Sequence, residues 1–169
     1  MQGTGGELTS DDVEILAAAI HETWRVLSRA EGWSMQLHLD KPYSDLVESD
    51  KEDNRAAAHC ILKVLALVGL GLRRDRDRTP RTAADSEVNA QLDQNMERLA
   101  EAEHDGWMAQ RCRNGWRWAE TRDDVRKLHS AMRPYTQLAE QEKGKDRNNI
   151  RHYPDFAARA GYRILPIGQ

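Results

Sequence analysis

An internal repeat constrains the fold of this chain more than any other feature. Residues 16–33 and 99–116 align without gaps, and the alignment pairs two tryptophans of the first segment with two of the second. The coinciding pairs are Leu16/Leu99, Ala17/Ala100, Ala19/Ala102, His21/His104, Trp24/Trp107, Gly32/Gly115 and Trp33/Trp116. Because tryptophan is rare, two such pairs in one register are a strong sign of duplication. We therefore expect two related units that bury their apolar faces against each other.

The similarity resumes after a change in length. Residues 41–46 (KPYSDL) parallel residues 133–138 (RPYTQL), and the pairs Lys51/Lys143, Arg55/Arg147 and Gly69/Gly161 keep the same spacing. These correspondences predict a first half at residues 8–72 and a second half at 91–165. Residues 73–90 are expected to be a charged, solvated linker, because residues 73–82 alternate Arg with Asp and include a proline.

Apolar residues at helical spacing predict the first helix of each half. In the first half the stripe is Val13, Leu16, Ala17, Ile20, Trp24 and Leu27. Thr9 or Ser10 can cap this helix. The matching stripe of the second half contains Leu99 and Trp107, but Glu103 takes the place of Ile20, so this face is less apolar.

The last segment of each half is also expected to be helical. Residues 56–72 are apolar nearly all round, which predicts a buried helix with Gly69 or Gly71 at its end. The matching residues 148–161 include Pro154, which we expect in a first helical turn. Strand signals are weak. The predicted fold class is all-α, with two pseudo-twofold-related helical halves that share one core.

Composition excludes several classes of protein. The net charge of −3 disfavours a general nucleic-acid binder, and no apolar run reaches the roughly 18 residues of a membrane helix. The amino terminus lacks the pattern of a secretory signal, and Cys60 and Cys112 form no CxxC pair. We expect a cytoplasmic protein without a metal or cofactor. The sequence is compatible with a homo-oligomer.

Catalytic motifs are also missing. The chain has no GxSxG, HExxH or Gly-rich phosphate loop. His104 and Asp105 form a dipeptide found in metal-dependent phosphohydrolases, but such a site needs more ligands, for example from His21, His129, His152 or Asp124. A duplicated histidine beside an acid, one turn before a tryptophan, is more simply a packing and capping feature. We expect no enzyme, with a phosphohydrolase as a minor alternative.

Two tryptophans are the main candidates for ligand binding. Trp24 and Trp107 occupy the same place on the two matching helices, so a planar heterocycle can stack at the seam. Arg111 lies one turn after Trp107 on the same face and can hold a phosphate, whereas Ser28 matches it in the first half. The alternative that Trp24 and Trp107 belong to the core is equally favoured by spacing. Trp33 and Trp116 are expected in the core.

Further candidates are polar. Asn54 and Arg55, and in the second half Arg147 and Asn148, are expected to open the last helix, where backbone amides attract anions. Ordinary capping is the alternative. A loop with Arg122, Asp123, Asp124 and His129 either closes one side of the seam or merely decorates it.

At these residues the chain resembles the RyR domain, the helical repeat of ryanodine receptors that also occurs free-standing in bacteria and phages. The second half carries the resemblance in residues 99–107, 115–116, 122–124, 127–129, 134–135, 138, 142–143, 147–148 and 161–162. The first half carries it in residues 16–33, 42–43, 51, 54–55 and 65–69. The chain is similar to one tandem pair of such repeats, although its first half lacks the Arg-Asp-Asp loop.

The resemblance implies a non-enzymatic ligand module. Receptor pairs accept adenine nucleotide at the seam, and prokaryotic relatives are associated with nucleotide signalling and antiviral conflict. The positions that match the seam are Trp24, Asn54, Arg55, Trp107, Arg111 and Arg147. We therefore expect a sensor or sponge for a cyclic nucleotide, an adenine nucleotide or an ADP-ribose-type signal. The alternative is a protein–protein interaction module without a small-molecule ligand.

Overall fold

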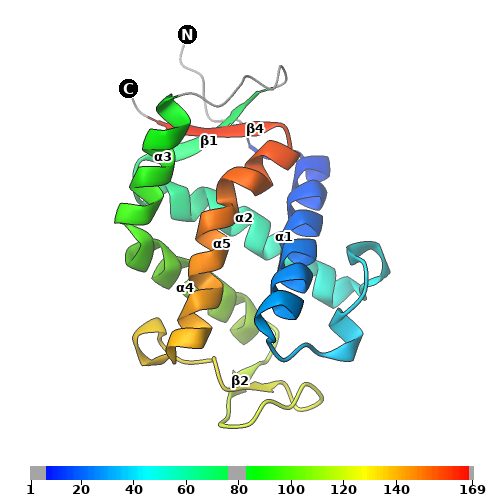
Figure 1. Cartoon of the computed structure of the whole chain (residues 1–169). Coiled ribbons are helices and arrows are strands. Elements are labelled where there is room, and N and C mark those ends of the chain that lie inside the picture. The colour runs from blue at the N-terminus through cyan, green and yellow to red at the C-terminus, as the bar shows by residue number, and fades with distance from the viewer. Residues whose placement is uncertain (1–6, 76–82, 168–169) are drawn as a thin grey trace.

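The structure is a computed structural model that describes residues 7–75 and 83–167. Its helices are α1 (Ser10–Glu31), α2 (Glu48–Ala66), α3 (Ala83–Gln94), α4 (Met96–Arg113) and α5 (Glu140–Arg159), as Figure 1 shows. Single 3-10 turns lie at η1 (Leu37–Leu39), η2 (Tyr43–Asp45) and η3 (Tyr135–Gln137). Strands β1 (Leu70–Arg74) and β4 (Tyr162–Pro166) pair antiparallel, and β2 (Arg117–Trp118) pairs parallel with β3 (Leu128–His129). The fold is mostly helical, but the expected all-α class misses these small sheets.

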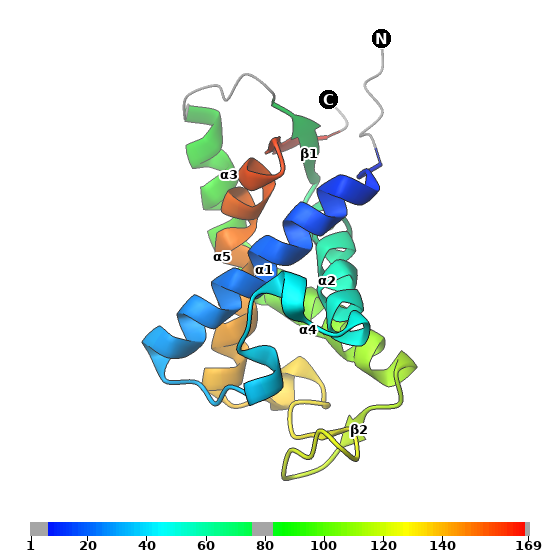
Figure 2. The same ribbon diagram turned by 90° about the vertical axis from the view of Figure 1, so that its right-hand side faces the viewer.

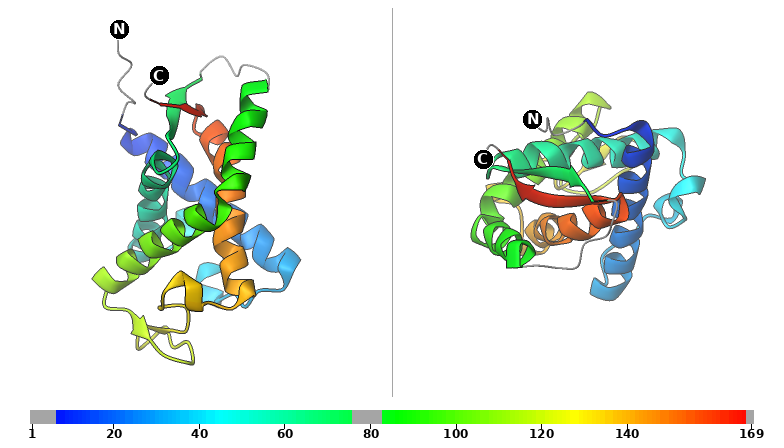
Figure 3. Two further views of the ribbon diagram at one scale, coloured as in Figure 1. Left: turned by 90° about the vertical axis from the view of Figure 1, so that its left-hand side faces the viewer. Right: turned by 90° about the horizontal axis from the view of Figure 1, so that it is seen from above.

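Helices α1, α2, α4 and α5 enclose the core. Both α1 and α4 pack against α2 and against α5, and the views in Figures 2 and 3 show this arrangement from two sides. The largest side chains in the core include Leu16, Leu99, Tyr153 and Phe156, all essentially inaccessible to solvent. Where α2 crosses α4, a Cβ atom on Gly106 would lie 2.5 Å from the Sγ atom of Cys60. Glycine at 106 therefore permits a close approach of these helices.

The start of α1 confirms the expected cap. The Thr9 hydroxyl accepts a hydrogen bond from the Asp12 backbone N–H (3.1 Å), and the Asp12 carboxylate accepts one from the Thr9 N–H (3.1 Å). The same carboxylate accepts hydrogen bonds from the Tyr162 hydroxyl (2.6 Å) and from Arg74 (2.9 Å). Asp12 thus ties the beginning of α1 to both strands of the β1–β4 ribbon, which crosses the end of the molecule seen in Figure 3.

The expected linker is ordered at both of its described ends. Arg73 and Arg74 continue β1 and pair with Arg163 and Tyr162, and residues 83–90 belong to α3. In α3 the side chains of Val88 and Leu92, one turn apart, are buried in the core. The linker prediction relied on the charged residues and was wrong here, because Arg73 and Arg74 lie at the exposed end of β1. Residues 76–82, with Pro80, lie outside the described residues.

The last helix of each half differs from the prediction. Helix α2 begins at Glu48, two turns earlier than expected, and residues 70–72 form a strand after the turn at Gly69, whose φ is +72°. Helix α5 continues without a break through Pro154, which was expected in a first helical turn. Proline removes one backbone donor, but the neighbouring Tyr153 and Phe156 are fully buried, and their packing holds the helix together. Within the described residues, no helix has the length and apolarity required to cross a bilayer.

Candidate functional site

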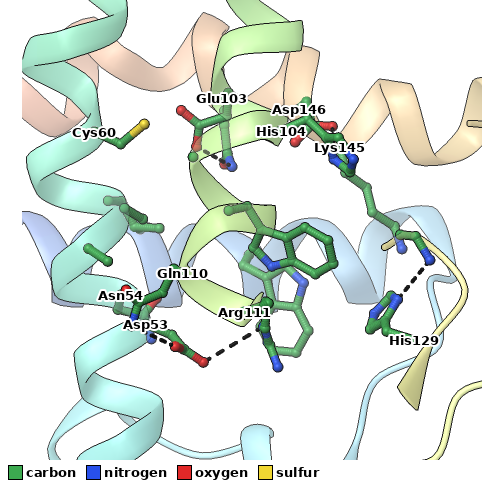
Figure 4. Close-up of a pocket in the computed structure, with 18 of the residues that line it drawn as sticks. Asp53, Asn54, Cys60, Glu103, His104, Gln110, Arg111, His129, Lys145 and Asp146 are labelled. Carbon is green, nitrogen blue, oxygen red and sulfur yellow. Dashed lines mark hydrogen bonds and ion pairs between the residues drawn. The ribbon is translucent and has the colours of Figure 1, made fainter. Parts of the chain in front are cut away.

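A pocket of about 240 Å³ lies between the two halves, between the carboxyl-terminal parts of α1 and α4 and the amino-terminal parts of α2 and α5 (Figure 4). Its volume is near the lower end of the roughly 300–1,000 Å³ typical of small-molecule sites. Its lining includes Ile20, His21, Trp24, Asp50, Asp53, Asn54, Ala57 and Cys60 from the first half. The second half contributes Glu103, His104, Trp107, Arg111, Arg122, His129, Glu142, Lys145, Asp146 and Asn149, among others. It is the natural candidate for a binding site.

Trp24 and Trp107 both line this pocket and are half-buried. The Trp24 ring stacks on His21, with ring centroids 5.8 Å apart and planes at 29°, and the Trp107 ring stacks on His104 at 5.5 Å and 29°. Each histidine is anchored by a backbone carbonyl, His21 Nε2 at 2.8 Å from Lys41 O and His104 Nε2 at 2.7 Å from Arg133 O. The histidines therefore hold both indoles in place at the pocket wall.

Arg111 is the most desolvated cation of the pocket. Its side chain is 14% exposed, and its Cζ atom lies 5.5 Å from the ring centre of Trp107 and 4.5 Å from that of Trp116. The Nε atom is buried without a hydrogen-bond partner among the described residues, 3.8 Å from Asp53 Oδ2 (Figure 4). Burial lowers the pKa of Arg111 and raises that of Asp53. This guanidinium is held by aromatic faces and is only loosely paired.

The expectation that Trp33 and Trp116 belong to the core is wrong. Both are half-buried, and Trp116 provides a flat support for Arg111. The Lys145 Nζ atom lies 5.3 Å from the ring centre of Trp33. The chain turns at Gly32 and Gly115, with φ of +68° and +85°, beyond the ends of α1 and α4. The tryptophans that follow therefore lie at the rim of the helical core.

The loop candidates Arg122 and His129 line the pocket. Arg122 is paired with Asp124, at 2.6 Å from Nε to Oδ1. The His129 ring meets Trp107 edge-on, with centroids 5.2 Å apart, and its Nδ1 accepts a hydrogen bond from the Ala131 N–H (3.0 Å). Burial, with the charges of Arg122 and Arg111, lowers the pKa of His129 to about 4. His129 is therefore neutral near pH 7 and carries its proton on Nε2, available as a donor.

Arg55 and Arg147 do not line the pocket. Because α2 and α5 begin at Glu48 and Glu140, these arginines lie within the helices and not at their starts, so the expected helix-start anion sites are wrong. Arg55 pairs with Glu14 and Glu48. Arg147 pairs with Glu97 (2.6 Å) and Glu140 (2.9 Å).

The neighbouring asparagines differ in their position, since only one of them lines the pocket. Asn54 lines the pocket and donates from Nδ2 to the Asp50 carbonyl (3.0 Å). Asn148 is not a lining residue, and its side-chain oxygen accepts a hydrogen bond from Arg151 (3.3 Å). Of the nine candidates, Trp24, Asn54, Trp107, Arg111, Arg122 and His129 converge on the pocket.

Sequence reasoning missed a buried acid in the pocket wall. Glu103 is 6% exposed, and its carboxyl group accepts hydrogen bonds from the Tyr153 hydroxyl and from Asn149 Nδ2 (3.4 Å). Burial raises the pKa of Glu103 to about 7. The signal was present in the sequence, since this glutamate interrupts an apolar stripe at the position of Ile20.

The His104–Asp105 dipeptide has no metal-site geometry around it. Across residues 7–75 and 83–167, no three His, Cys, Asp or Glu side chains come together in a way that could hold a metal ion. His104 Nδ1 lies 3.5 Å from Asp146 Oδ2, and its other nitrogen faces the Arg133 carbonyl. Asp105 is exposed and does not line the pocket.

Comparison with known proteins gives one family. The family model of the RyR domain matches residues 79–166, more than half of the chain and all of its second half. No curated protein sequence matches the chain significantly. The matched span includes α4, α5 and β4, and with them Trp107, Arg111 and Glu103 of the pocket wall. The chain belongs to the RyR domain family.

Proposed function

We propose that this protein is a non-enzymatic module that binds a nucleotide-derived small molecule, as a sensor or a sponge. The observation that carries the proposal is the placement of Trp24 and Trp107, from different helices, in one pocket with Arg111. A planar base gains about 1–3 kcal/mol from stacking on an aromatic side chain. The guanidinium beside Trp107 supplies hydrogen-bond donors for a phosphate.

We also propose that the two halves are repeats related by a pseudo-twofold axis. Several contacts that recur at matching positions support this. The Tyr43 hydroxyl donates to Glu14 and the Tyr135 hydroxyl to Glu97, each at 3.0 Å. Lys51 Nζ lies 5.8 Å from the Tyr43 ring centre, and Lys143 Nζ lies 5.4 Å from that of Tyr135. Strands β1 and β4 end the two halves and pair with each other.

The charges of the pocket restrict the ligand. Its cations already have acidic neighbours, Arg111 with Asp53, Arg122 with Asp124, and Lys145 with Glu142 (3.0 Å). A triphosphate would bring about four negative charges that these pairs cannot balance. A cyclic nucleotide, a monophosphate or an ADP-ribose-type molecule fits this balance better.

Isothermal titration calorimetry with the whole chain tests the proposal. The panel contains AMP, GMP, cyclic AMP, cyclic GMP, ADP-ribose and ATP, each at physiological ionic strength. We expect heat of binding with at least one ligand that carries one or two phosphates, and weaker or no binding of ATP. The absence of heat with every member of the panel would exclude the proposed function.

One observation favours the second candidate, a protein–protein interaction module. The loop beside the pocket exposes two large apolar side chains, with Trp118 50% and Val125 95% exposed. Substitution of both by Ser tests this alternative, since a partner that uses the loop would be lost while ligand binding in the pocket is retained. Loss of nucleotide binding in that variant would assign the loop to the pocket instead.

A further inference from the structure

The two walls of the pocket differ in their hydrogen-bonding chemistry. In the first half, Ile20 of α1 and Ala57 of α2 line the pocket. At the matching positions of the second half stand Glu103 of α4 and Asn149 of α5, which also line it. We call the first pair the apolar wall and the second pair the polar wall. At these two matching pairs, only the second half places hydrogen-bonding groups in the pocket wall.

The fold does not require the polar wall. Glu103 accepts a hydrogen bond from the Tyr153 hydroxyl, and the residues at the matching positions of the first half are Ile20 and Ile61. Both isoleucines are buried in the same core, at 8% and 1% exposure. An apolar pair therefore satisfies the packing of this place in the first half. A buried carboxyl group with its phenol partner is a costly replacement unless it has a function.

The charge of Glu103 is not compensated within the protein. No cationic side chain in the described ranges forms an ion pair with it, and the groups that face it are Tyr153, Asn149 and Asp146 of α5 and Cys60 of α2. Asp146, a second carboxyl group, raises the pKa of Glu103 further, after the larger effect of burial. Tyr153 and Asn149 donate one hydrogen bond to each carboxyl oxygen, which leaves one lone pair on each oxygen free for a ligand.

We propose that Glu103 reads the base of the bound nucleotide by accepting two adjacent N–H donors, and that the pocket consequently prefers guanine to adenine. This inference rests on the proposed function. Guanine presents its N1–H and 2-amino donors side by side, which matches the two oxygens of a carboxylate. Adenine presents one amino donor beside an acceptor nitrogen, whose lone pair would face a carboxylate oxygen. Hypoxanthine, which lacks the 2-amino group, retains one of the two guanine donors.

Calorimetric titration of the whole chain with GMP, IMP and AMP at pH 8 tests the inference. We expect GMP to bind about tenfold more tightly than IMP, because each lost hydrogen bond to a charged group costs about that factor or more. AMP should bind more weakly than GMP by at least as much. Equal or tighter binding of AMP would overturn the guanine preference while leaving nucleotide binding intact. Absence of heat with all three ligands would overturn the proposed function as well.

Glu103→Gln provides the matched arm of the experiment. The amide keeps the shape of the side chain but loses one acceptor, so the preference for GMP over AMP should fall to less than about threefold. Glu101→Gln, on an exposed position of the same helix, is the control and should retain the full preference. A retained preference in Glu103→Gln would overturn the assignment of this residue.

Two further measurements keep the test independent of the folding of one variant. The double variant Glu103→Ile with Tyr153→Ile copies the pair found at Ile20 and Ile61, and it should remain helical and lose the preference. In the wild type, the preference for GMP over AMP should fall as the pH is lowered from 8 to 6, because protonation removes one acceptor from Glu103, whereas the phosphates of the two ligands titrate alike. A preference that is constant over this range would contradict the proposal.

Discussion

The outer contacts of the two halves match, whereas their pocket walls differ. On the outside, Arg55 pairs with three glutamates and Arg147 with two, and Tyr43 and Tyr135 each donate a hydrogen bond to one of these glutamates. Inside, Ile20 faces the pocket in the first half and Glu103 in the second. The halves thus share most of these outer contacts and the tryptophans of the pocket wall, Trp24 and Trp107, but they differ at Ile20 and Glu103. A module built in this way suits a ligand with two chemically different sides.

The difference extends beyond the pocket lining. Ser28 and Arg111 occupy matching positions, and the Ser28 hydroxyl oxygen and the Arg111 Nε atom are both buried without a hydrogen-bond partner in the described part of the chain. Ser28 is 1% exposed and lies away from the pocket, whereas Arg111 lines it. The second half therefore has a guanidinium in the pocket wall where the first half has a serine outside the lining.

The largest effect is expected from Trp107→Ala. Its indole lines the pocket, stacks on His104 and supports Arg111, so its loss removes a stacking surface and frees the guanidinium. Nucleotide affinity should fall by about 100-fold, the upper part of the range for one stacked base. Calorimetry measures the affinity, and circular dichroism checks that the chain remains helical.

Trp24→Ala and Trp118→Ala sharpen this prediction. Trp24→Ala should lower the nucleotide affinity less than Trp107→Ala does, because no arginine among the described residues packs on Trp24. Trp118→Ala should leave the nucleotide affinity unchanged, because Trp118 does not line the pocket. If Trp24→Ala and Trp107→Ala instead each lower the free energy of unfolding by about 3–5 kcal/mol, as truncation of a buried aromatic residue does, the two indoles belong to the core. The stacking hypothesis then fails.

The next effect concerns stability and pH. Because the pKa of Glu103 is raised from 4.5 to about 7, the folded state binds this proton more tightly than the unfolded state does. The contribution of Glu103 to the free energy of unfolding should therefore fall as the pH rises from about 4.5 to about 7, and stay low above that range. Glu103→Gln removes this loss, so it should stabilise the protein by about 2 kcal/mol at pH 8 and have little effect at pH 4.5. Urea denaturation at the two pH values measures the difference.

Glu101→Gln serves as the reference for that measurement, since its side chain is exposed. Equal effects of the two substitutions at pH 8 would mean that the Glu103 carboxyl group ionises without cost in the folded protein. The polar wall would then lower the free energy of unfolding no more than the apolar wall does.

The sequence predicted the two helices that carry Trp24 and Trp107, because the spacing of apolar residues is a local pattern. A cap at Thr9 or Ser10 followed from capping chemistry, and Thr9 caps α1. The β1–β4 ribbon could not be predicted in this way, because its strands are distant in the chain and are held by tertiary contacts such as Tyr162 to Asp12. The continuity of α5 through Pro154 depends likewise on packing.

The candidate site was only partly accessible to such reasoning. Arg55 and Arg147 were selected because they were expected to open helices, where backbone amides attract anions, but both lie within helices and pair with glutamates. Glu103 was passed over because it breaks the apolar pattern, although that break is what distinguishes the two walls. Both kinds of position line the pocket, since Trp24 and Trp107 agree between the halves whereas Ile20 and Glu103 differ.

Arg111→Lys should have a moderate effect. Lysine retains the charge opposite Asp53 but cannot lie flat between the rings of Trp107 and Trp116. We expect a loss of about 1 kcal/mol in binding, near fivefold to tenfold in affinity, for ligands with a phosphate. The corresponding nucleosides, which lack the phosphate, should show a smaller change. An equal loss for nucleotide and nucleoside would place the phosphate away from Arg111.

The smallest effects are expected from Arg55→Gln and Arg147→Gln. Each substitution removes an ion-pair cluster whose glutamates are largely exposed, so each should lower the free energy of unfolding by less than about 1 kcal/mol. Since two ion pairs match and Arg55 has one more with Glu52, the two losses should agree within about 0.5 kcal/mol, the size of one exposed ion pair. Neither variant should change nucleotide affinity, because neither arginine lines the pocket. A threefold or larger loss of affinity in only one of them would show that the binding site extends beyond the pocket, onto the outer face of that half.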